Sequence, residues 1–148
     1  MDADKRGLKH KDLTERIIGV FFEVYNELGH GFLESVYEKS LEIGLVSVGL
    51  RVQRQVRVPV WFREQRVGDF AADMLIDDCV LLELKAARAL DSSHEAQLLN
   101  YLRATQVEVG LLLNFGIKAE FKRMAFDNSR KQIRENPRLS AAILLSDE

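Results

Sequence analysis

The amino-acid sequence predicts a single α/β domain built around a mixed sheet. Apolar residues recur at helical spacing in the first fifty residues, three strand-like runs follow between residues 51 and 85, and a further helix precedes one or two more strands. The middle strands should form an antiparallel meander, whereas the helical crossover from the run ending at Lys85 to the run 109–115 should join parallel strands in a right-handed sense. A chain of 148 residues can bury a core for such a domain.

Composition and charge are those of an ordinary soluble globular protein, with 47% hydrophobic residues, 30% charged residues and a formal net charge of −2. This balance argues against a protein that coats nucleic acid through bulk electrostatics, but leaves room for an enzyme with one local basic surface. The sequence lacks a run of about 18 apolar residues and begins with a polar stretch unlike a secretory signal, so we expect a cytoplasmic protein. The single Cys79 cannot form an internal disulfide and should be a packed thiol. Candidates for a basic surface, with solvated strand faces as the alternative, are Arg51, Arg54, Arg57, Arg63 and Arg66 in one segment and Lys118, Lys122 and Arg123 in another.

Two amphipathic helices are predicted after a loose arm that covers residues 1–11. The first ends at Gly29, and the second spans about 32–48 and is closed by Gly49. Glu34 continues the apolar stripe of the second helix, which would place a carboxylate on the inner face; the alternative is a first-turn glutamate stabilised by the helix dipole. The inner faces are marked by Leu13, Ile17, Val20, Phe21, Val24 and Leu28 in the first helix and by Tyr37, Leu41, Gly44, Leu45 and Val48 in the second.

The three central strands bring charged residues into an apolar setting. Residues 51–62 form the first strand, in which Pro59 indicates an edge position or a bulge, and the polar turn 63–66 leads into the run 67–76. The third run, residues 80–86, is apolar except for Glu83 and Lys85, which leave the strand on the same face. Buried charges cost several kcal/mol unless they are paired, hydrogen-bonded or bound to a metal. One parity of the first strand carries Val52, Val56, Val58 and Val60.

The length of the turn between the second and third strands decides whether Asp73 faces Glu83. A two-residue turn at Asp77 and Asp78 would put the two carboxylates on opposite faces. A three-residue connection ending at Cys79, or a β-bulge near Asp73, would place them opposite each other, with Cβ atoms about 5 Å apart. Carboxylates this close suit a hard divalent ion such as Mg²⁺. The alternative is a Glu83–Lys85 ion pair on a half-exposed strand, with Asp73 merely near the end of its own strand.

A third helix and two further strands complete the domain. A capping box over 92–95 predicts a helix to about residue 104, on which Gln97 and Tyr101 share a face with His94; a surface glutamine and a core tyrosine are the alternative. Strands are predicted at 108–115, ended by a glycine, and at 121–126. Residues 127–148 form a tail, and its apolar part near Ile143 could dock on the body, join a second copy in a homodimer, or stay loose.

Three motifs resemble one known family. Asp73, followed after nine residues by Glu83-Leu84-Lys85, resembles the Asp…Glu-x-Lys signature of the PD-(D/E)XK nuclease superfamily. The segment from Gly31 through Glu34 to Tyr37 matches the Gly-x-x-Glu-x-x-Tyr motif of the GxxExxY proteins, a branch of that superfamily. The spacing of Gln97 and Tyr101 resembles its Gln-x-x-x-Tyr motif. The resemblance implies a restriction-endonuclease-like α-β-β-β-α-β core with an extra N-terminal helix over residues 12–126.

The resemblance also implies a function, a metal-dependent nuclease that hydrolyses phosphodiester bonds of DNA or RNA. Asp73 and Glu83, with the carbonyl of Leu84, would hold Mg²⁺ or Mn²⁺, and Glu34 would bind the ion directly or through water. Lys85 would orient the attacking water and stabilise charge on phosphorus. Gln97 would position Lys85 or a phosphate, and Tyr101 would support the pocket. The alternatives are a non-catalytic nuclease-fold module that binds nucleic acid or a protein partner, and an enzyme that acts on another phosphorylated substrate.

Overall fold

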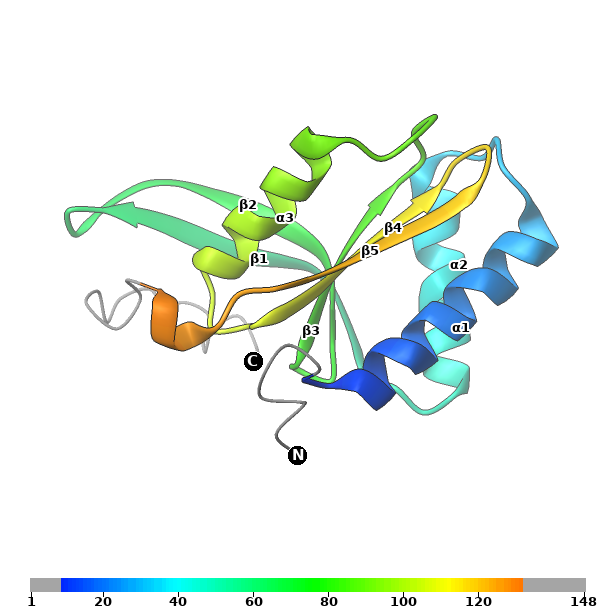
Figure 1. Ribbon diagram of the computed structural model, residues 1–148, viewed down its shortest axis with the longest axis horizontal. Helices are drawn as coiled ribbons and strands as arrows, with labels where there is room; N and C mark the ends of the chain where they lie inside the picture. Colours follow the sequence, from blue (N-terminus) through cyan, green and yellow to red (C-terminus); the bar gives the residue numbers. More distant parts are fainter. Residues whose placement is uncertain (1–8, 132–148) are drawn as a thin grey trace.

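The structure of the protein is a computed structural model that describes residues 9–131. Five strands form one sheet with helices against both of its faces (Figure 1). The elements in chain order are α1 (Lys11–Leu28), α2 (Glu34–Ser47), β1 (Val52–Phe62), β2 (Gln65–Ile76), β3 (Val80–Lys85), α3 (Ser92–Arg103), β4 (Val109–Phe115), β5 (Ala119–Ala125) and the short 3₁₀ helix η2 (Asn128–Arg130).

The sheet has the strand order β1-β2-β3-β4-β5, so each strand pairs with its neighbours in sequence. Among the strands of residues 9–131, only the β3–β4 pair is parallel, and α3 provides the connection between these two strands. The remaining neighbours are antiparallel. The predicted mixed sheet, its meander and its parallel crossover are therefore confirmed, and Pro59 lies on the edge strand β1, as its missing N–H requires.

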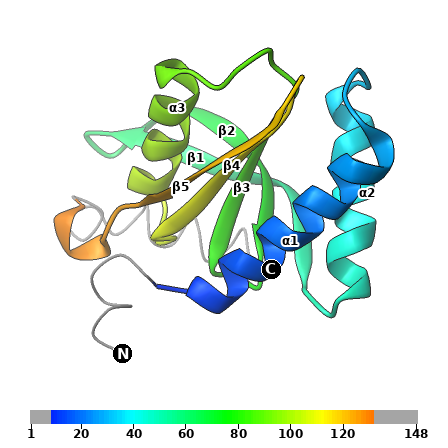
Figure 2. The ribbon, with the colours of Figure 1, turned by 45° about the vertical axis from the view of Figure 1, so that its right-hand side comes forward.

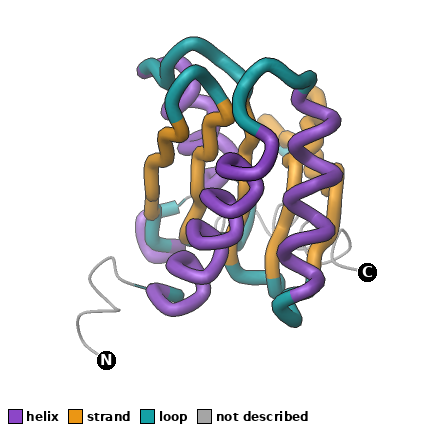
Figure 3. The backbone as a smooth tube through the Cα atoms, turned by 90° about the vertical axis from the view of Figure 1, so that its right-hand side faces the viewer, coloured by secondary structure: helices purple, strands orange, loops and turns teal. Residues whose placement is uncertain are grey.

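Two apolar clusters hold the layers together. The larger one fills the space between the sheet and the helices α1 and α2, which lie side by side on one face (Figure 3). The smaller one lies under α3 on the other face (Figure 2). β3 contributes to both, because alternate residues point to opposite faces: Leu82 belongs to the first cluster and Leu81 to the second.

In β1 and β2, the alternation of side chains between the two faces of the sheet shifts by one residue partway along each strand. Ala72 and Leu75 are three residues apart, yet both belong to the cluster under α3. On β1, Val52 packs in the other cluster whereas Val56 joins this one, so the prediction of one valine face from Val52 to Val60 was wrong. Gln55 lies at this shift with a φ of 53°, a left-handed conformation that is uncommon for a residue other than glycine.

The β2–β3 connection has three residues, as one of the two predicted registers requires. Ile76 pairs with Val80, and Asp77 and Asp78 between them both have positive φ, which aspartate tolerates better than most residues. Continuing the ladder past the Met74–Leu82 pair brings Asp73 opposite Glu83. The two-residue alternative, which would have separated these carboxylates, is excluded.

Three local predictions differ from the structure. The second helix begins at Glu34 rather than near residue 32, and Val48 lies beyond its end with 41% of its surface exposed instead of on the inner face. The N-cap of α3 is Asp91, not Ser92, since its carboxylate accepts the backbone N–H groups of Ser93 and His94. The His94 ring accepts the N–H of Asp91 in return and so closes the capping box.

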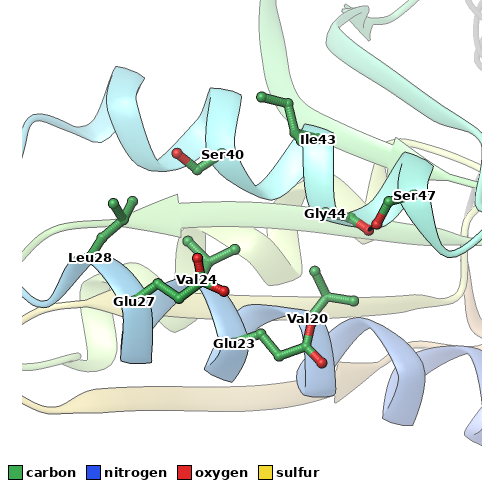
Figure 4. Close-up of a pocket in the computed structure, with 9 residues that line it drawn as sticks. All are labelled: Val20, Glu23, Val24, Glu27, Leu28, Ser40, Ile43, Gly44 and Ser47. Atoms are coloured by element: carbon green, nitrogen blue, oxygen red, sulfur yellow. Dashed lines mark hydrogen bonds between the residues drawn. The ribbon is translucent and has the colours of Figure 1, made fainter.

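The helices α1 and α2 pack closely at Gly44. A Cβ atom built there would lie 2.7 Å from a methyl carbon of Val20. A pocket lies between the two helices, with Ile43 from α2 and Glu23 and Glu27 from α1 among its lining residues (Figure 4).

Some predictions concern residues outside 9–131. Most of the predicted arm 1–11 and the apolar segment around Ile143 lie there, so the loose arm, the docked tail and the homodimer stay predictions. Within the described residues, no helix is long and apolar enough to cross a membrane.

Candidate functional site

The motif residues of β2 and β3 meet those from the middle and the last turn of α3. β2 supplies Asp73, β3 supplies Glu83 and Lys85, and α3 supplies Gln97 and Tyr101. The strand residues are adjacent because the three-residue turn sets the register, and the helix residues follow because α3 crosses back over the sheet.

The carboxylates of Asp73 and Glu83 are interlocked with the backbone of each other's strand. The backbone N–H of Asp73 donates to Oε2 of Glu83 at 3.1 Å, and the N–H of Leu84 donates to Oδ2 of Asp73 at 2.8 Å. Glu83 is 4% exposed, whereas Asp73 is half-buried. The side chains thus replace part of the β2–β3 ladder, and both acids are held in fixed positions.

Both carboxylates are harder to ionise than usual. Burial, followed by repulsion from Asp73, raises the pKa of Glu83 from 4.5 to about 8. Burial also raises the pKa of Asp73, and the negative charges of Glu38 and Glu34 add to the effect, although the hydrogen bond from Leu84 opposes it. Among the described residues, no ammonium or guanidinium lies within 4.0 Å of either acid. A cation between them would therefore relieve a real electrostatic cost.

Lys85 does not form the ion pair with Glu83 that the simpler alternative requires. Its Nζ donates instead to Oε1 of Gln97 at 2.9 Å, and Nε2 of Gln97 donates to the hydroxyl of Tyr101 at 2.9 Å. The Tyr101 ring stacks on Phe70 of β2, with centroids 3.8 Å apart and planes 4° from parallel. This chain of contacts fixes the amide orientation of Gln97, and so it fixes the position of the ammonium group.

Glu34 lies at the edge of this arrangement. It is the first residue of α2 and is exposed, as in the first-turn alternative, but its charge raises the pKa of both Asp73 and Glu83. A partner on the same helix face was not predicted: Glu38, one turn further, also raises the pKa of Asp73. Arg54 of β1 donates to Glu38 at 3.1 Å and holds it against the sheet. The spacing of four between the two glutamates was a visible signal for Glu38, whereas nothing local indicated Arg54.

The donor set fits a hard divalent ion. The two carboxylates offer oxygen, and the N–H of Leu84 points towards Asp73; because the N–H and C=O of one strand residue point to the same side, the Leu84 carbonyl also faces β2. In the part of the chain that the structure describes, no three His, Cys, Asp or Glu side chains are arranged to hold a metal ion. A Mg²⁺ ion would therefore rely on the two carboxylates, the carbonyl and water, and this ion usually keeps several waters.

The predicted basic patch of β1 and β2 is largely neutralised. Arg51 pairs with Asp78, Arg54 with Glu38 and Glu42, and both Arg57 and Arg66 with Asp69. The guanidinium of Arg63 lies over the Phe62 ring. This surface is therefore a network of surface ion pairs and not an open cationic face.

The mixed five-stranded sheet with helices on both faces, and with the two acids and the lysine on its central strands, has the restriction-endonuclease-like fold. The chain belongs to the PD-(D/E)XK nuclease superfamily, whose family model matches residues 11–124. Among solved structures it resembles the crystal structure of SSO0001, at a TM-score of 0.51 and 16% identity, over 95% of this chain and 69% of the other. At this identity the likeness concerns the fold alone. No curated protein matches the sequence significantly.

Proposed function

We propose that the chain is a metal-dependent phosphodiesterase that cleaves nucleic acid. The observation that carries this proposal is the pair of carboxylates of Asp73 and Glu83, held side by side without a described cationic partner, next to an ammonium group with a fixed position. Membership of a nuclease superfamily supports nucleic acid as the substrate.

Each residue has a separate role in this reaction. Asp73, Glu83 and the carbonyl of Leu84 would hold Mg²⁺ or Mn²⁺, which when bound would polarise a phosphoryl oxygen and lower the pKa of a water molecule. Glu34 would reach the ion through water, since it lies at the exposed edge. Lys85 would orient the attacking water and stabilise the negative charge that develops on phosphorus.

Gln97 and Tyr101 are positioning residues for Lys85. Because Nε2 of Gln97 donates to the tyrosine hydroxyl, Oε1 remains to accept from the ammonium group. Rigid placement matters here, since loss of position by about 1 Å can cost a hundredfold in rate.

The test combines metal binding and cleavage in one set of variants. Calorimetric titration with Mg²⁺ should give binding to the wild type that Asp73→Asn abolishes. Lys85→Ala should abolish cleavage of labelled DNA or RNA without abolishing Mg²⁺ binding, and Lys39→Ala, on the exposed face of α2, is the matched control. Cleavage that survives Lys85→Ala would contradict the mechanism. Nucleic-acid binding that is indifferent to Mg²⁺ and to Glu83→Gln would instead favour the non-catalytic module.

We also propose that the chain belongs to the GxxExxY branch. Gly31 adopts a φ of 110°, which favours glycine, and Tyr37 is fully buried. The Tyr37 hydroxyl donates to the carbonyl of Gly29 at 2.5 Å and accepts the N–H of Phe32 at 3.2 Å. The glycine and the tyrosine of the motif thus shape the α1–α2 connection, and this places Glu34 at the start of α2. Substitutions of Tyr37 should therefore shift Glu34 and change its influence on the pKa of Asp73 and Glu83.

A further inference from the structure

A second hollow opens beside the candidate site, at the end of the sheet where β3 and β4 finish. Its walls come from three connections, with His30 and Phe32 from α1–α2, Arg88 from β3–α3 and Ile117 from β4–β5. Figure 1 shows these connections at the same end of the sheet. The first lining residue of the β3–α3 connection directly follows Lys85, so the wall of the hollow begins one residue, about 3.3 Å along the backbone, from Lys85.

The walls are fixed by buried contacts. The fully buried Asn114 accepts the N–H of Ala87 at 2.9 Å and donates to its carbonyl at 3.0 Å. Gly116 approaches the same connection so closely that a Cβ atom would lie 2.1 Å from the carbonyl oxygen of Ala87. The Tyr25 hydroxyl lies 2.7 Å from the carbonyls of both Gly116 and Ile117. The hollow is thus preformed by the fold.

Phe32 offers an aromatic surface at the rim. Its side chain is 47% exposed, and its ring lies at 79° to the Tyr37 ring with centroids 6.0 Å apart. Tyr37 in turn stacks on Phe115 at 4.3 Å, so the exposed ring rests on buried aromatic rings. Ile117, 57% exposed, adds apolar surface from the β4–β5 connection. An exposed ring with a fixed orientation is a platform on which a flat group can stack.

The charges around this hollow are not neutralised as those of β1 and β2 are. Arg88 and Lys118 are exposed, and neither forms an ion pair with an acid in residues 9–131. An aromatic platform with cationic groups beside it is the combination that binds the bases and phosphates of single strands.

We propose that this hollow, the base pocket, binds one unpaired nucleobase next to the phosphodiester group at Asp73 and Glu83, so that the substrate is single-stranded or locally unpaired nucleic acid. The proposal rests on the proposed function. The volume of about 220 Å³ lies below the roughly 300 Å³ at which pockets for whole drug-sized ligands begin, which suits a single ring system. A base inside a duplex is stacked on both sides and cannot enter without leaving the helix.

The test measures binding of labelled (dT)20 and (rU)20 and of a duplex of equal length to the full chain, without divalent ions so that no cleavage occurs. Phe32→Leu keeps an apolar side chain at the rim but removes the aromatic face. It should weaken single-strand binding by about 5- to 100-fold and leave duplex binding nearly unchanged. Phe121→Leu, at another exposed aromatic residue, is the matched control and should change neither affinity.

A second variant gives a readout that a folding defect cannot imitate. Phe32→Trp should lose indole fluorescence when (dT)20 binds, but not when an abasic strand of equal length binds. Equal single-strand affinity of the wild type and Phe32→Leu, or no fluorescence change on (dT)20, would overturn the base pocket.

Cleavage by the same proteins separates the two proposals. If Lys85→Ala abolishes cleavage while Phe32→Leu binds single strands as the wild type does, the base pocket is wrong and the phosphodiesterase stands. If binding depends on Phe32 but no protein cleaves in Mg²⁺, the pocket stands and the proposed chemistry is wrong.

Discussion

Replacing Glu83 by glutamine should remove a pH dependence of stability that the site imposes on the fold. The glutamine side chain would be nearly isosteric, and its oxygen could still accept the N–H of Asp73, which Glu83 accepts at 3.1 Å. The variant lacks the carboxyl group of Glu83, and burial raises the pKa of that group from 4.5 to about 8. The substitution therefore tests the electrostatics of the site with little change in packing.

The direction follows from proton linkage. A carboxyl group with a raised pKa favours the folded state while it is protonated, so its contribution is fully present below about pH 4.5 and is lost as the pH rises through about 8. At about 1.4 kcal/mol per pKa unit, the metal-free wild type should lose roughly 3 kcal/mol of unfolding free energy between pH 5 and pH 8. The raised pKa of Asp73 acts in the same direction. Lys131 acts in the opposite direction, because burial lowers its pKa to about 8. Its charged form destabilises the folded state, so the unfolding free energy rises as Lys131 loses its proton.

The assay is urea unfolding at pH 5, 6, 7 and 8 in EDTA, for the wild type, Glu83→Gln and the exposed control Glu23→Gln. The stability of Glu83→Gln should fall less across this range than that of the wild type and the control, by roughly the 3 kcal/mol that the Glu83 carboxyl group contributes. Millimolar Mg²⁺ should then stabilise the wild type at pH 8 and leave Glu83→Gln unchanged, because the ion binds the deprotonated pair. A variant whose stability has the same slope against pH as that of the wild type would refute the reasoning.

Four further predictions concern the site and its supports. The Mg²⁺ affinity of the wild type should rise by up to about tenfold per pH unit below pH 8 and level off above it, which calorimetry at several pH values measures; a pH-independent affinity would contradict a site at Glu83. Gln97→Leu should lower kcat by about 10- to 100-fold with little effect on Mg²⁺ affinity, because only the ammonium group of Lys85 loses its position, and unchanged kcat would exclude the positioning role. Gly116→Ala should destabilise the fold by about 1–3 kcal/mol through its clash with a backbone oxygen, whereas Gly19→Ala, in open space on α1, should stabilise it by up to about 1 kcal/mol; thermal unfolding of both variants checks the contrast. Tyr37→Phe should cost about 1–2 kcal/mol, since it leaves a carbonyl and an N–H of the α1–α2 connection without their partner, and a melting temperature equal to that of the wild type would count against this.

Much of the site could be predicted from the sequence, because charged residues in apolar runs are locally visible. Glu83 and Lys85 interrupt a strand that is otherwise apolar, and Gln97 and Tyr101 share a helix face, so periodicity alone indicated which of these side chains lie together. The geometric pairing of Asp73 with Glu83 required one more fact, the length of the turn, which the sequence left open between two values.

Other features depended on residues far apart in the chain. The positive φ of Gln55 lies where the parity of its strand shifts, yet glutamine carries none of the local signals that glycine or asparagine would give. The Arg54–Glu38 contact joins an edge strand to a helix, and no spacing within either element indicates it. The base pocket is assembled from three connections, each of which by itself looks like an ordinary loop.

The sequence by itself thus determined the order of the elements, most of their buried faces and the identity of the acids, the lysine and their helical partners. These properties follow from side-chain chemistry repeated at the periods of a helix and a strand. Only the tertiary structure decided that Lys85 bonds to Gln97 instead of Glu83, that Glu83 is almost fully buried beside a second carboxylate, and that Phe32 stands exposed over a preformed hollow. The physical reason is that burial, hydrogen-bond choice and pKa depend on all the atoms that surround a group, and most of those atoms belong to distant parts of the chain.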